Sequence, residues 1–149
     1  MPHPRLLLAS LGLTVLTLGA GPALAQSAPP SLYHRLGGYD KIAAFVDDFI
    51  ERFDADPALA PFLGGLNAAA GARVRQRIVD LVCARTGGPC LYTGQTMEAT
   101  HEGLPITDAH FDAVIRHMRA AMDHQGMPAS ARDQLLEILT AMRPAMVAK

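Results

Sequence analysis

The chain has 149 residues, 50% of them apolar, with no Trp and 5% aromatic residues, which suits one compact domain with an aliphatic core and excludes a second domain. Its 13 basic and 14 acidic residues give a formal net charge of −1, and no basic block is present. We therefore expect no nucleic-acid partner.

The first residues have the pattern of a secretory signal peptide. Arg5 precedes an apolar run over residues 6–16, and the small-residue pattern Ala23-Leu24-Ala25 follows. The run is shorter than the roughly 20 residues that a membrane-spanning helix needs. We expect cleavage after Ala25, no stable membrane anchor after cleavage and a periplasmic or secreted protein; an uncleaved anchor is the alternative. The chain then divides into a signal peptide (1–25), a short linker (26–31) and a folded domain (32–149).

Two long helices are predicted in the first half of the folded domain. One runs from about Asp40 to Phe53, because apolar residues recur there at three- and four-residue steps with charged residues between them. Prolines and glycines over residues 57–65 then mark an irregular corner that carries Phe62 and Leu63. The second helix runs from about Ala69 to Arg85, on an apolar stripe of Val74, Ile78, Leu81 and Val82.

A loop and a short helix follow. Gly87-Gly88-Pro89 ends the second long helix, and the stretch to Gly94 shows no periodicity. We expect an ordered loop that leads into a short helix carrying His101. Cys83 and Cys90 flank the start of this loop, and in an oxidising compartment they can form a disulfide; the sequence leaves that open.

Two further long helices are predicted after His101. The third helix runs from the predicted N-cap Thr107 to Gly126. Ser130-x-x-Asp133 resembles a capping box that opens the last helix, which we expect to continue to Pro144. No segment alternates as a strand does, so the predicted fold class is all-α, with four long and two shorter helices.

Taken in order, these landmarks resemble the group 1 truncated haemoglobins. The resemblance extends from about Leu32 to Met142. The residues that carry it are Gly37-Gly38, Phe62 at the corner, Gly87-Gly88-Pro89, Tyr92-Thr93-Gly94, Met97-x-x-x-His101 and His110-Phe111-x-x-Val114-x-x-His117. It implies a shortened globin fold, a two-over-two helical sandwich around a non-covalently bound haem b.

The resemblance makes His101 the proximal ligand of the haem iron, and a neutral imidazole is a common ligand for that metal. Met97 lies four residues earlier, on the same helical face, so we expect it to pack on the porphyrin and not to ligate the opposite side. The other expected haem contacts are Phe62, Leu63, Ile50, Val74, Ile78, Tyr92 and Phe111. The alternatives are an ordinary surface or core histidine for His101, core packing for Phe62 and Leu63, and a turn-shaping role for Tyr92.

One departure from the family concerns the distal side. Members commonly place a tyrosine in the first long helix and a glutamine in the next, where both hydrogen-bond to the bound gas, but the matching positions here hold Ile50 and Ile78. Gln76 points nearly opposite the apolar stripe of its helix, whereas Arg77 lies beside that stripe. Arg77 is therefore the polar distal candidate, with an exposed arginine as the alternative. We expect an apolar distal pocket, weaker oxygen retention and faster autoxidation.

The other histidines and the cysteines give no second metal site. His110, His117 and His124 recur every seven residues, about 10 Å along a helix, which is too far for two imidazoles to share one ion. The Cys-x-x-Cys-His motif of covalently attached haem is absent from the sequence.

The predicted function is reversible binding of oxygen, nitric oxide or carbon monoxide at a His-ligated haem iron. The purpose is transport, sensing or nitric oxide detoxification, and a reductase is a candidate partner. Enzyme activity, as nitric oxide dioxygenation or weak peroxidase turnover, stays open. The alternative is a haem-free globin-fold module that binds a protein or a lipophilic partner.

Overall fold

Four long helices form the framework of the computed structural model, which describes residues 28–148. The long helices are α2 (Gly38–Ala55), α4 (Ala68–Arg85), α6 (Asp108–His124) and α7 (Ala129–Thr140). The short helices are α1 (Leu32–Arg35), α3 (Ala60–Leu63), α5 (Met97–His101) and α8 (Arg143–Met146). The described part of the chain contains no strand, which confirms the all-α prediction. The predicted signal peptide and the start of the linker lie outside the described residues.

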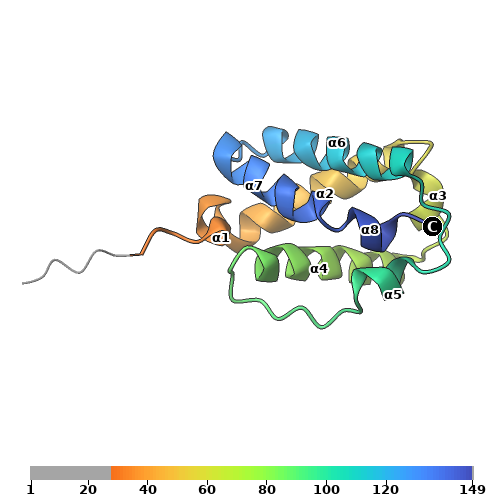
Figure 1. Cartoon of the computed structure of the whole chain (residues 1–149), viewed down its shortest axis with the longest axis horizontal. Coiled ribbons are helices and arrows are strands. Elements are labelled where there is room, and N and C mark those ends of the chain that lie inside the picture. Colours follow the sequence, from red (N-terminus) through yellow and green to blue (C-terminus); the bar gives the residue numbers. More distant parts are fainter. Residues whose placement is uncertain (1–27, 149) are drawn as a thin grey trace, which may run out of the picture.

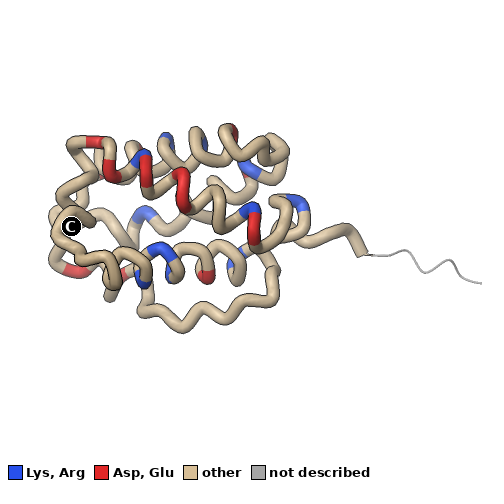
Figure 2. Tube along the Cα trace, turned by 180° about the vertical axis from the view of Figure 1, so that it is seen from behind, with Lys and Arg blue, Asp and Glu red and all other residues tan. Residues whose placement is uncertain are grey.

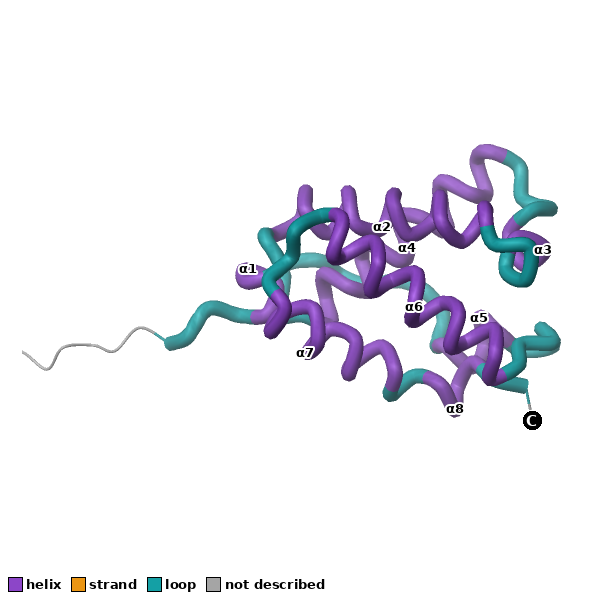
Figure 3. Tube along the Cα trace, turned by 90° about the horizontal axis from the view of Figure 1, so that it is seen from above, coloured by secondary structure: helices purple, strands orange, loops and turns teal. Residues whose placement is uncertain are grey.

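The long helices pack as two layers of two. Helix α2 packs against both α4 and α6, and α6 also packs against α7. Figures 1 and 3 show the resulting arrangement, with α5 and α8 side by side at the end where the chain finishes. This is the two-over-two helical sandwich that the family resemblance implies.

Buried aliphatic and aromatic side chains of α2 lie at the centre of the core. Ile42, Phe45 and Val46 have no solvent exposure, and they cluster with buried residues of α4, α6 and α7. These three residues fall at three- and four-residue steps along one face of α2, so burying that face accounts for the helix. Apolar burial of this kind contributes most of the stability of a small domain.

The structure contains the disulfide that the sequence left open. Cys83, at the end of α4, is bonded to Cys90, and their Cα atoms are 5.7 Å apart. The bond ties the loop before α5 to the last turn of α4. That loop, residues 86–96, carries no charged residue, whereas both signs of charge are interspersed over the helices (Figure 2).

Three details of the helix boundaries differ from the prediction. The corner at Phe62 forms α3, and α8 follows α7, so there are four short helices and not two among the described residues. Helix α7 has Pro128 at its N-cap without a side-chain cap, so the capping box predicted at Ser130 is wrong. Asp133 instead accepts hydrogen bonds from Arg119 and Arg132.

The end of the last long helix is the third difference. Helix α7 ends at Thr140, and Pro144 lies in the first turn of α8 and does not terminate the longer helix. A first-turn position suits proline, because a backbone N–H there has no partner within the helix. No helix in the described range is long and apolar enough to span a membrane.

Candidate functional site: an apolar cavity beside His101

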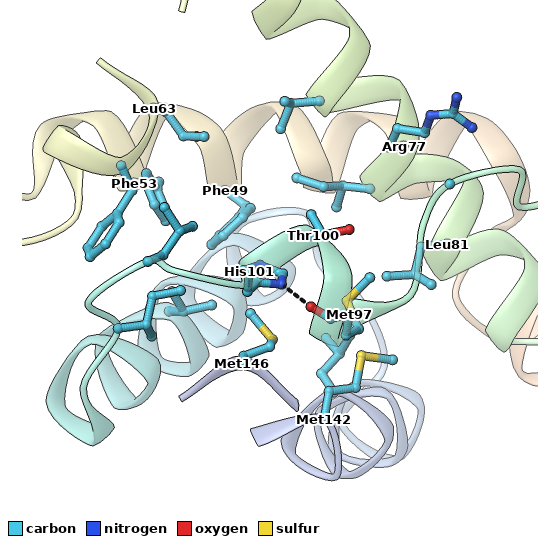
Figure 4. Close-up of a pocket in the computed structure, with 18 of the residues that line it drawn as sticks. Phe49, Phe53, Leu63, Arg77, Leu81, Met97, Thr100, His101, Met142 and Met146 are labelled. Atoms are coloured by element: carbon cyan, nitrogen blue, oxygen red, sulfur yellow. Dashed lines mark hydrogen bonds between the residues drawn. The ribbon is translucent and has the colours of Figure 1, made fainter. Parts of the chain in front are cut away.

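A cavity of about 700 Å³ lies between the helical layers and the short helices. Its volume falls within the roughly 300–1,000 Å³ that is common for cofactor and small-molecule sites. The wall is mostly apolar, and α2, α3, α4, α5, α6, α7 and α8 all contribute to it. Figure 4 shows the side chains of these elements converging around His101.

His101 is the last residue of α5 and is partly buried. Its Nδ1 lies 2.7 Å from the backbone carbonyl oxygen of Met97, one turn earlier (Figure 4). Because a carbonyl oxygen only accepts, Nδ1 must carry the hydrogen and donate it. A neutral His101 therefore keeps the lone pair on Nε2, which is the protonation pattern that a metal-ligating histidine needs.

Helix α5 is short, and two local features hold it. The hydroxyl of Thr96 caps the helix by accepting a hydrogen bond from the backbone N–H of Ala99. In the turn before it, the Tyr92 hydroxyl donates to the carbonyl oxygen of Gln95 over 2.8 Å. Gly94 leaves room for that ring, since a Cβ on it would lie 2.3 Å from the ring of Tyr92.

Eight of the nine predicted haem contacts lie on this one cavity wall. They are His101, Met97, Phe62, Leu63, Val74, Ile78, Tyr92 and Phe111. These residues come from four helices and one loop, so the fold brings together positions spread over 50 residues of sequence.

Ile50 is the exception, and the expected contribution of α2 is corrected. Ile50 is partly buried against the hydrophobic core and does not line the cavity. Phe49 and Phe53 line it instead. They lie four residues apart on one face of α2, and Ile50 is rotated by about 100° from Phe49 around the helix axis.

The polar side chains of α4 do not fill the cavity. Gln76 lies outside it and donates hydrogen bonds to the Tyr39 hydroxyl over 3.0 Å and to the Asp80 carboxylate over 2.8 Å. Arg77 lies at the cavity edge, is exposed, and donates a hydrogen bond to the hydroxyl of Thr93. In Figure 4 its guanidinium extends away from His101. The α4 wall itself is apolar at Val74 and Ile78.

His110 is a polar lining residue that was not predicted from the sequence. Its ring packs edge-on against Phe62, with centroids 5.1 Å apart, and its Nδ1 accepts a hydrogen bond from the backbone N–H of Thr107 over 3.2 Å. Thr107 in turn caps α6, as predicted, and His110 completes the capping box. Because Nδ1 accepts, neutral His110 carries its hydrogen on Nε2. The Thr-x-x-His spacing was the signal available in the sequence.

The other two histidines of α6 pair with aspartates of α2 and its C-cap. His117 Nε2 lies 2.7 Å from Asp56, and His124 Nδ1 lies 2.5 Å from Asp48. The hydrogen bond from His117 holds the pKa of Asp56 below its usual 3.8. Burial raises the pKa of Asp48, but hydrogen bonds from Arg52 and His124 outweigh it, so that pKa is also lowered. These pairs link α6 to α2 and its C-cap. The described residues contain no group of three or more His, Cys, Asp or Glu that could hold a metal ion.

Two methionines of the chain end are further lining residues that the sequence did not indicate. Met142 and Met146 reach the cavity from α8 and the residue before it. Helix α8 is held by Arg143, whose guanidinium pairs with Asp108 and Asp112 and lies 4.4 Å from the centre of the Phe111 ring. A four-residue helix shows no periodicity, so its place on the wall is visible only in the structure.

Comparison with known proteins places this fold in a family. The model of the bacterial-like globin family matches residues 31–148. A group 1 truncated hemoglobin, GlbN of Nostoc sp., is 33% identical over 119 residues, covering 80% of this chain and 98% of that protein. The hemoglobin of the thermophilic phototrophic bacterium Chloroflexus aurantiacus superposes with a TM-score of 0.71 at 26% identity, covering 81% of this chain and 100% of the other.

A second solved structure has the same fold and a bound cofactor. The 2/2 hemoglobin of Synechococcus sp., solved with covalently attached heme, gives a TM-score of 0.68 at 25% identity and covers 74% of this chain and 91% of that one. Family match, sequence identity and fold therefore agree. The chain belongs to the bacterial-like globin family and is a truncated haemoglobin.

Proposed function

We propose that the chain binds one haem b in the cavity, with the iron held by Nε2 of His101, and that it binds a diatomic gas through that haem. The observation that carries the proposal is the hydrogen bond from Nδ1 of His101 to the Met97 carbonyl, because it leaves a free Nε2 lone pair at the wall of an apolar cavity of about 700 Å³. Haem supplies, when bound, an iron that takes up oxygen, nitric oxide or carbon monoxide.

The chain's own residues support a non-covalent haem. Its two cysteines are bonded to each other, so neither offers a thiol for attachment to the porphyrin. The Synechococcus relative carries covalently attached heme, so an experiment must decide how haem is attached in this chain. Extraction with acidified organic solvent is expected to remove all haem from the loaded protein, and haem that stays with the polypeptide would contradict this part of the proposal.

The central test is a haem titration of the purified protein followed by visible absorption. We expect stoichiometric uptake with a Soret band, and a collapse of that band in His101→Ala. A matched control is His34→Ala, because His34 is exposed on α1 and does not line the cavity. An unchanged spectrum in His101→Ala would refute the ligand assignment. Absence of any haem uptake, with binding of a lipophilic dye, would favour the haem-free module.

The lining supports reversible gas binding with weak oxygen retention. Val74, Ile78 and Phe111 present apolar surface to the cavity, and a guanidinium N–H of Arg77 donates a hydrogen bond to Thr93. A hydrogen bond to a polarised ligand is worth about 1–3 kcal/mol, so its loss speeds oxygen release. Stopped-flow oxygen dissociation is expected to be fast in the wild type. Slow release that becomes fast in Arg77→Ala would show that Arg77 reaches the gas.

Gas binding by the haem is compatible with three biological uses: transport, sensing and nitric oxide detoxification. Transport and sensing need reversible binding alone, whereas nitric oxide detoxification also needs electrons from a reductase to restore the ferrous iron. Turnover of nitric oxide by oxygen-loaded protein, with and without an added electron donor, separates the third use from the first two. We infer only gas binding, which all three share.

We further propose that the protein is exported through residues 1–25. The Cys83–Cys90 disulfide supports this, because such bonds persist mainly in oxidising compartments. N-terminal sequencing of the protein from a periplasmic extract is expected to begin at Gln26. Recovery of the uncut chain from the cytosol or the membrane fraction would contradict it.

A further inference from the structure

We propose that Met97, Met142 and Met146 form a peroxide-sensitive modification site, and that their oxidation to sulfoxides weakens the hold of the cavity on its ligand. The consequence for the ligand rests on the proposed haem function. The modification itself is independent of haem.

The three thioethers gather around His101. Met97 comes from α5, and Met142 and Met146 come from the chain end around α8. All three are partly buried and line the cavity, and α5 and α8 contact each other. Figure 4 shows their side chains on the side of the cavity where His101 lies.

Solvent reaches this group from a second direction. An open cleft of about 750 Å³ lies beside α5 and α8, and His101 and Met146 line both this cleft and the main cavity. A small polar oxidant can therefore reach Met146 even when a ligand fills the cavity. Among the three methionines, Met146 alone borders both spaces, so we expect it to react first.

The other methionines of the described chain are less accessible. Met118, Met122 and Met127 are 9%, 0% and 6% exposed and belong to the hydrophobic core, although Met118 also borders the main cavity. Oxidation of methionine follows accessibility, so the structure divides the six residues into a reactive group and a protected group.

The chemical step is complete with hydrogen peroxide as the oxidant. A sulfur lone pair attacks one peroxide oxygen, the S–O bond forms and the O–O bond breaks. The second oxygen leaves as water with both protons. Sulfur loses two electrons and the peroxide gains them, and a methionine sulfoxide reductase can reverse the change.

The sulfoxide acts on the part of the cavity wall that α8 forms. A sulfoxide is polar, so a wall that packs as an apolar surface must expose it to water or bury it without a partner. Helix α8 has four residues, none of them buried, and is held by Arg143 and by a hydrogen bond from the Ala148 N–H to the Ile106 carbonyl. We expect α8 to move away from α5 upon oxidation, which opens the cavity beside His101.

The test treats the haem-free protein with hydrogen peroxide for graded times, removes the oxidant and measures each methionine by peptide mass spectrometry. The same samples are then titrated with haem. We expect Met146 to oxidise first, Met97 and Met142 next, and the three core methionines last. Haem affinity should fall about tenfold, the effect of one buried polar group without a partner, and should recover after treatment with the reductase.

Two variants test whether the three cavity methionines cause the loss of haem affinity. Each peroxide-treated variant is compared with its own untreated sample. In Met97→Leu/Met142→Leu/Met146→Leu, which keeps the side-chain volume close to that of methionine, peroxide should change haem affinity by less than about twofold. Met122→Leu/Met127→Leu, in the core away from the cavity, should stay as sensitive as the wild type.

The inference is overturned if all six methionines oxidise at one rate, or if the triple leucine variant loses as much affinity as the wild type. A failure of the proposed function gives a different result, because untreated protein then takes up no haem. In that case the order of sulfoxide formation alone decides whether the modification site exists.

Discussion

Helices α4 and α5 both wall the cavity, but they are stabilised in different ways. Helix α4 has 18 residues, an Asn67 cap, a bidentate ion pair from Arg75 to Asp47 and a disulfide at its end. Helix α5 has five residues and buries none of them. Isolated helices shorter than about 12 residues are marginal in water, so α5 depends on its cap, on the preceding loop and on α8.

Within this small domain, the elements that provide stability therefore differ from the element that carries the candidate haem ligand. The long helices carry the core, whereas the candidate ligand His101 stands on a short element with few stabilising contacts. Regions of low local stability are commonly the ones that open and move. Substitutions in the long helices should therefore change the free energy of unfolding, and substitutions at α5 and α8 should change mainly the behaviour of the cavity.

The largest expected effect is in the core of α2. Phe45 is fully buried and does not line the cavity, so Phe45→Ala should lower the free energy of unfolding by about 3–5 kcal/mol in a urea titration. Met146→Ala on α8 should lower it by about 1 kcal/mol or less, since that side chain is only partly buried. Equal losses in the two variants would show that α8 belongs to the cooperative core.

The second-largest expected effect concerns the Asp48 carboxyl, whose contribution to the free energy of unfolding depends on pH. Asp48 of α2 accepts hydrogen bonds from Arg52 and His124, and these outweigh burial, so its pKa lies below the usual 3.8. A carboxyl with a lowered folded-state pKa stabilises the fold above its unfolded pKa, and that stability is lost as the pH falls through the folded pKa. Asp48→Asn should therefore cost about 1.5–3 kcal/mol at neutral pH.

Urea titrations from neutral to strongly acidic pH measure this dependence. The gap between the wild type and Asp48→Asn should narrow as the pH drops below 3.8. Asp54→Asn is the matched control, because Asp54 is exposed on the same helix, and it should change little. A gap of constant size across the whole range would mean that the charge of Asp48 contributes nothing.

The long helices were predictable because their apolar periodicity repeats over several turns. Helix α2 spans Gly38–Ala55 where the pattern predicts about Asp40 to Phe53, and α4 starts one residue earlier than expected. Periodicity fixes which side of a helix is buried, but not which neighbour on that side meets a cavity. Phe49 rather than Ile50 therefore lines the wall, because the positions of α4 and α6 decide it.

The short elements were harder to predict. The sequence landmarks around His101 predict a haem ligand there, whereas Met146 gives no signal, because the four residues of α8 cannot show a period and Pro144 resembles a helix stop. The sequence does not predict that His110 lines the cavity, although its spacing from Thr107 suits a capping box. Local signals thus locate caps and turns, and tertiary packing decides which of them reach the cavity.

The smallest expected effect compares matched caps on α6 and α5. Thr107 and Thr96 each accept a hydrogen bond from the backbone N–H three residues on, so Thr→Ala removes the same interaction from a helix of 17 residues and from one of five. Thr107→Ala should lower the free energy of unfolding by about 1 kcal/mol, the usual value of an N-cap, with little change in haem release. Thr96→Ala should lower the free energy of unfolding by less than half as much, because global unfolding does not depend on α5. It should nevertheless speed haem release several-fold, because the cap orients the turn that carries His101.

Urea titration measures the free energy of unfolding, and haem transfer to an excess of apomyoglobin measures the rate of haem release, both on the same preparations. Equal losses of stability in both variants, with equal rates of haem transfer, would contradict the division between a stabilising framework and a weakly held ligand helix.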